Sequence, residues 1–122
     1  MKFKFSSLND NLSILTEGKI MTLHKYVSED KKQVTISIED RFDFSLHQKF
    51  REAYEDCIQS NVEINIDLSK TSYMDSSALG MILLLKDHVE KFACTFKISK
   101  PNETVNQILE IAQFHRLMTI EK

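Results

Sequence analysis

The triplet Asp75-Ser76-Ser77 stands directly before an apolar run, and its side chains could carry chemistry. If Asp75 is the N-cap of a helix, Ser76 and Ser77 occupy its first two positions, beside unpaired backbone N–H groups. Met74 and Leu79 then take the N′ and N4 places of a hydrophobic staple. The helix dipole would favour a phosphate on Ser76. The same residues also form a common helix cap, so spacing alone leaves both interpretations open.

Other catalytic and ligand-binding patterns are missing from the sequence. It contains no Gly-x-Ser-x-Gly motif, no glycine-rich phosphate loop and no histidine or cysteine cluster with metal-ligand spacing. His88 lies about three helical turns beyond the serines, and His24 and His115 are scattered. His47 could approach the serines from the first helix, although a solvated histidine on a helix is several times more common. We therefore expect no enzyme activity, no metal and no cofactor.

The composition is that of a single soluble domain: 122 residues, 42% of them apolar and 28% charged. A net charge of -2 argues against nucleic acid as a partner. The longest apolar stretch, 78–85, is shorter than the about 20 residues of a membrane span, and the N-terminus lacks a signal-peptide pattern. Cys57 and Cys94 stand alone on apolar faces, which favours buried free thiols. We predict a cytoplasmic protein that binds neither nucleic acid nor membranes.

Strict alternation of apolar and polar residues predicts the strands. It runs through 34–38, 62–68 and 94–98, and 23–27 also reads as a strand. Alternation indicates a sheet that is buried on one face and solvated on the other, whereas a sheet covered on both faces would show continuous apolar runs. The sheet should therefore carry helices on one side only.

Helical periodicity fills the gaps between these strands. Apolar stripes predict helices over 45–60, 76–92 and 103–115, followed by a short strand at 118–120. Strand–helix–strand units give parallel pairing with right-handed crossovers, which place all helices on the same face. This predicts an α/β fold with a mostly parallel sheet.

Residues 1–20 fit this scheme poorly. They are polar and weakly patterned, and a second methionine follows at position 21. An extra strand, a flexible extension and a sequence upstream of an alternative start all remain open. We predict a domain over 21–122 and an N-terminal extension that its core does not need.

Three loops should meet at the carboxyl ends of the parallel strands, where functional groups gather in such sheets. They are residues 39–43, 69–75 and 99–102. The middle loop leads into Asp75 and the two serines, so this edge is the candidate site.

The segments 66–68 and 73–80 resemble the signature of STAS domains, and more narrowly that of the bacterial anti-sigma factor antagonists. The resemblance extends over roughly residues 21–120. It implies a sheet of four or five mostly parallel strands with helices on one face. Two positions depart from the family pattern: Ala78 replaces a usual glycine, and Glu39-Asp40 replace another. Alanine is well tolerated in the first helical turn.

The resemblance also implies roles for individual residues. Ser76 matches the serine that an ATP-dependent anti-sigma factor kinase of the histidine-kinase-like type phosphorylates, and a PP2C-type phosphatase reverses the modification. Asp75 matches the acidic residue before it, and Asp43 an aspartate close to the phosphorylation site. Neighbours of the switch complete the expected partner-binding set: Met74, Ser77 and Ala78. The family binds its anti-sigma factor when unphosphorylated and releases it when phosphorylated, without being an enzyme.

Two other functions remain open. A constitutive STAS subunit of a transport or signalling assembly would use Ser76 only as part of a helix cap. A small α/β hydrolase would use Ser76 as its nucleophile.

Overall fold

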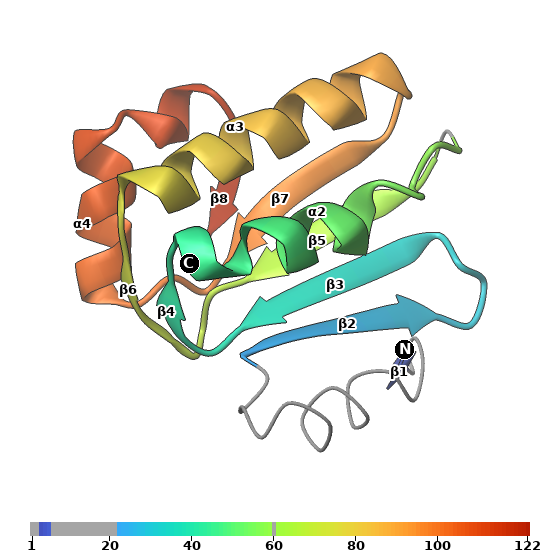
Figure 1. Ribbon diagram of the computed structural model, residues 1–122. Helices are drawn as coiled ribbons and strands as arrows, with labels where there is room; N and C mark the ends of the chain where they lie inside the picture. Colours follow the sequence, from blue (N-terminus) through green and yellow to red (C-terminus); the bar gives the residue numbers. More distant parts are fainter. Residues whose placement is uncertain (1–2, 6–21, 60) are drawn as a thin grey trace.

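The computed structural model describes residues 3–5, 22–59 and 61–122. A six-stranded sheet forms its centre, in the order β1-β2-β3-β5-β7-β8 (Figure 1). The strands are β1 (Phe3–Phe5), β2 (Leu23–Ser28), β3 (Gln33–Ile38), β5 (Glu63–Asp67), β7 (Thr95–Ser99) and β8 (Thr119–Glu121). β1, β2 and β3 pair antiparallel, whereas β3, β5, β7 and β8 pair parallel. The expected mostly parallel sheet is confirmed, and β1 adds a strand to the four or five that the family resemblance implied.

The helices cover one face of this sheet (Figure 1). They are α2 (His47–Tyr54), α3 (Ser76–Lys91) and α4 (Glu103–Ile111), with short 3₁₀ turns η1 (Phe44–Leu46) and η2 (Phe114–Arg116). Alternate strand residues point toward them and are fully buried, including Ile36, Ile64 and Ile66. The one-sided alternation in the sequence therefore reports the layer arrangement correctly.

α2 ends at Tyr54, earlier than the predicted helix over 45–60. The backbone beyond it bonds to the next layer instead of continuing the helix. The carbonyl of Cys57 accepts from His88 Nε2 at 3.0 Å and lies 3.5 Å from Cys94 Sγ, and the carbonyl of Gln59 lies 3.1 Å from the same thiol. Cys57 and Cys94 are free and buried, as predicted, and desolvation raises the pKa of Cys57 to about 11.

A second sheet was not predicted. β4 (Asp40–Phe42) pairs parallel with β6 (Thr71–Met74) beyond the carboxyl ends of β3 and β5. Asp40 has a left-handed backbone with φ of 65°, and its N–H donates to the Lys70 carbonyl at 2.8 Å. Along the chain, β4 stands between β3 and η1, and β6 stands between β5 and α3. No helix among the described residues combines the length and the apolar character needed to cross a bilayer.

Removal of residues 1–20 is expected to leave the core folded. Among the described strands, β1 pairs with β2 alone at the edge of the sheet, and the described core side chains begin at Leu23. We expect a chain that begins at Met21 to melt within a few degrees of the full chain. Since about 1 kcal/mol shifts the melting temperature of a domain this size by roughly 4 °C, a larger fall would show that the extension contributes to the fold.

Candidate functional site

Asp75 is the N-cap of α3, as the sequence predicted. Its backbone is extended, and its Oδ1 accepts from the N–H of Ala78 at 3.0 Å and from the Ser77 hydroxyl at 2.6 Å. These two bonds hold the pKa of Asp75 below its usual value, and the bond from Ser77 has the larger effect. Ser76 occupies the first helical position, and its side chain is exposed. No residue that the structure describes hydrogen-bonds to the Ser76 hydroxyl, so this hydroxyl faces solvent without a described partner.

The small β4–β6 sheet places Asp43 beside Asp75. Phe42 and Met74 are partners in its register, so the two aspartates follow at the same end of neighbouring strands. The N–H of Asp75 also donates to the Phe42 carbonyl at 3.3 Å. The charge of Asp43 is close enough to oppose ionisation of Asp75, although the Ser77 bond outweighs it. The proximity that the family resemblance implied is thus present, and two parallel strands produce it.

Asp43 is itself held ionised by its own neighbour. Asp43 is the N-cap of η1, and its Oδ1 accepts from the N–H of Ser45 at 2.9 Å and from the Ser45 hydroxyl. The hydrogen bond from the Ser45 hydroxyl is the main reason that the pKa of Asp43 lies below its usual value. The candidate site therefore carries two negative charges before any modification.

The three predicted loops do meet at one edge. The Nδ2 of Asn102 donates to the carbonyl of Thr71 at 2.7 Å, and the Thr71 hydroxyl donates to the carbonyl of Ile38 at 2.6 Å. Asn102 also caps α4, because its Oδ1 accepts from the N–H of Val105 at 2.8 Å. These bonds tie the end of β3, the start of β6 and the loop between β7 and α4 into one unit.

Arg41 is a site residue that the sequence reasoning missed. Its guanidinium carbon lies 5.0 Å from the centre of the Tyr73 ring, and its Nε lies 3.4 Å from Oδ2 of Asp43. The three-residue strand that presents it is too short to show a period, so no periodic signal could have identified it.

An exposed strip runs along α3 from Ser76. We call Ser76, Gly80, Leu83 and Leu84 the α3 strip, because their spacing places them on one face of the helix. Leu84 is 61% exposed and Leu83 is 42% exposed. A Cβ at Gly80 would meet nothing within 4 Å, so the surface there is open. Large exposed apolar side chains beside a polar site are typical of a protein-binding surface.

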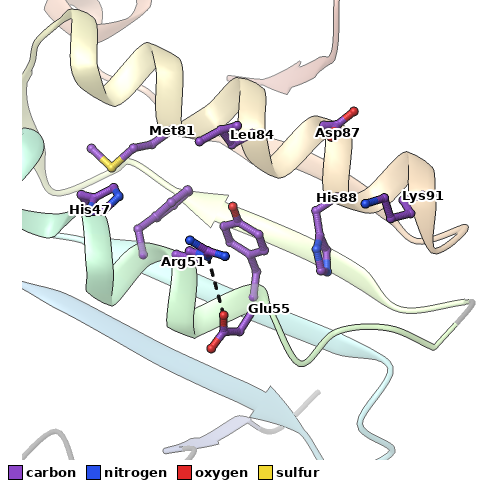
Figure 2. Close-up of a pocket in the computed structure, with 10 residues that line it drawn as sticks. His47, Arg51, Glu55, Met81, Leu84, Asp87, His88 and Lys91 are labelled. Atoms are coloured by element: carbon purple, nitrogen blue, oxygen red, sulfur yellow. Dashed lines mark ion pairs between the residues drawn. The ribbon is translucent and has the colours of Figure 1, made fainter.

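A groove of about 320 Å³ lies between α2 and α3, beside the α3 strip (Figure 2). Met81 and Leu84 line it from α3, and an ion pair between Arg51 and Glu55 spans 3.8 Å on the α2 side. His88 lies at the far end of the groove, where its ring packs edge-on against another aromatic ring at 5.0 Å. The groove therefore adjoins the α3 strip, and Leu84 belongs to both.

The histidines do not form a catalytic set with the serines. His47 stacks on Phe44 with ring centres 4.8 Å apart, and both His47 and His88 line the groove. Within the described ranges, no histidine hydrogen-bonds to Ser76 or Ser77. Over the same residues, no group of three or more His, Cys, Asp or Glu side chains is placed to hold a metal ion.

This arrangement agrees with comparisons to known proteins. The family model for the STAS domain matches residues 25–122. The chain belongs to the STAS-domain family. A STAS-domain containing protein of Pseudomonas aeruginosa, strain UCBPP-PA14, is 39% identical over 100 residues, which are 82% of this chain and 99% of that protein.

Solved structures share the STAS fold. The crystal structure of a candidate anti-sigma factor antagonist from Thermotoga maritima aligns with a TM-score of 0.69 and 20% identity, over 80% of this chain and 84% of that one. The anti-sigma factor antagonist SpoIIAA in its unphosphorylated form aligns with a TM-score of 0.64 and 19% identity, over 82% and 87%. The resemblance inferred from the segment around Ser76 is confirmed at the level of family and fold.

Proposed function

We propose that this STAS protein is an anti-sigma factor antagonist that phosphorylation of Ser76 switches. The observation that carries the proposal is the exposed, unbonded hydroxyl of Ser76 at the start of the apolar α3 strip. One modification there alters the edge of a surface suited to a protein partner. The two structural neighbours named for this activity support the same assignment.

The proposed partner is a cytoplasmic anti-sigma factor that is also a serine kinase of the histidine-kinase-like type. It binds the unmodified α3 strip, transfers phosphate from ATP to Ser76 and then releases the product. A PP2C-type phosphatase restores the binding form. The protein itself supplies a binding surface and a phosphate acceptor, and no catalytic group.

The experiment is a transfer assay with purified anti-sigma serine kinases of the source bacterium and labelled ATP. We expect one kinase to label the wild-type chain and to leave Ser76→Ala unlabelled. Binding of unmodified chain without any labelling would favour the constitutive-subunit alternative. Hydrolysis of simple esters that Ser76→Ala abolishes would favour the hydrolase.

Ser76, and not Ser77, is expected to carry the phosphate. The Ser77 hydroxyl already donates to Asp75, and its side chain is half-buried, whereas Ser76 is exposed. Mass spectrometry of the kinase-treated chain locates the modification. Ser77→Ala should still be labelled, and phosphate found on Ser77 in the wild type would contradict the assignment.

A further inference from the structure

The outer face of the β4–β6 sheet gathers one cation and two carboxylates around the start of α3. Arg41 pairs in register with Tyr73, and side chains alternate along each strand. Phe42 and Met74 point into the core, where they are 0% and 1% exposed. Arg41 and Tyr73 therefore share the outward face, which leads toward Asp75 and Ser76.

Arg41 is only loosely engaged in the unmodified chain. Its side chain is 62% exposed, and it contacts Asp43 through Nε alone at a long 3.4 Å. Asp43 keeps two hydrogen bonds from Ser45 whether or not Arg41 stays. Arg41 can leave Asp43 without stranding an unsatisfied carboxylate.

A phosphate on Ser76 would change the balance of charge at this point. It adds about -1.5 to -2 charge beside Asp75 and Asp43, both of which are held ionised. An arginine fork binds a phosphate through two parallel hydrogen bonds, which are stronger than a single long contact to a carboxylate. The Tyr73 ring supports the guanidinium from one side.

We propose that Arg41 is a positioning residue for phosphorylated Ser76: it exchanges Asp43 for the phosphate and holds that group at the N-terminus of α3. This inference rests on the proposed function, because it takes Ser76 as the modified residue. It adds that a side chain of the protein itself, Arg41, fixes the position of the phosphate.

The test uses the full chain synthesised with phosphoserine in place of Ser76 by amber suppression, so that no kinase is needed. Phosphorus NMR follows the second ionisation of the phosphate. A neighbouring cation lowers the pKa of that group, and Arg41→Gln should therefore raise it, by about half a pH unit for an exposed pair. Arg41→Lys keeps the charge without the fork and should give an intermediate value.

Arg116→Gln is the matched control, since it removes the same charge from η2, where Arg116 bonds to Gln113. It should leave the phosphate pKa unchanged. The Arg41 Nε–H signal in proton–nitrogen spectra gives a second readout, which does not depend on the folding of any variant: it should shift when Ser76 carries phosphate.

An equal phosphate pKa in wild type and a folded Arg41→Gln, or an unmoved Nε–H signal, would overturn the role of Arg41. The proposed function fails by a different result, namely the absence of kinase labelling or of a phosphate effect on partner binding. The two failures are therefore distinguishable.

Discussion

A phosphate on Ser76 is expected to weaken binding of the anti-sigma factor at least about a hundredfold while the fold stays intact. The group adds about -1.5 to -2 charge at pH 7. The helix N-terminus offsets part of the repulsion from Asp75 and Asp43, by roughly 0.3–1 kcal/mol. Docking of a partner on the α3 strip would remove water from the same phosphate, whose charge Arg41 neutralises only in part, and burying the uncompensated remainder costs several kcal/mol. Because every 1.4 kcal/mol is tenfold in affinity, desolvation dominates.

Two variants and a charge control test this switch. Ser76→Ala should bind as the wild type does, whereas Ser76→Asp should lose part of the affinity. Ser69→Asp adds the same charge at an exposed loop position outside the α3 strip and should bind normally. Calorimetry with the purified anti-sigma factor measures affinity, and circular dichroism checks the fold. Equal affinity of the phosphorylated chain and the wild type would contradict the switch.

The sequence predicts those parts of the fold in which a regular pattern of residue types repeats or a local motif marks a boundary. Strand alternation located the central strands, and the Asp-Ser-Ser cap located the start of α3 at Ser76. Both signals are local: a side chain either faces the core or does not, and a capping carboxylate bonds to backbone within one turn. The same signals placed the three loops at one edge of the sheet.

The local geometry of the site has no such signal. β4 and β6 are three and four residues long, and their pairing, between residues 31 or 32 positions apart in the chain, brings Asp43 beside Asp75. The family resemblance supplied that proximity, and the residues alone did not. Beyond the early end of α2, the carbonyl of Cys57 likewise contacts the side chains of His88 and Cys94, which only tertiary packing brings there. Contacts between residues this far apart along the chain leave no pattern in any short stretch of sequence.

Phe42 is the side chain that anchors this geometry, and Phe42→Ala is expected to cost about 3–5 kcal/mol of unfolding free energy. Its ring is fully buried in the core and packs on Phe50 with ring centres 5.2 Å apart. Truncation leaves a cavity that the surrounding strands and helix fill only in part. For a domain of this size the melting temperature should fall by roughly 10–20 °C.

Phe44→Ala, two residues along, is the matched control. That ring is 64% exposed and, among the aromatic rings of the described residues, stacks on His47, so its loss should change stability by no more than about 0.5 kcal/mol. Thermal unfolding of both variants compares the two rings, and an equal loss would contradict the anchoring role of Phe42.

Hydrogen exchange then connects stability to the site. The amide of Asp75 donates to the Phe42 carbonyl, so Phe42→Ala should speed its exchange more than that of amides in the middle of α3. Arg41 precedes Phe42 on β4 and Asp43 follows directly after the strand, so the one buried ring is expected to hold both side chains near the start of α3.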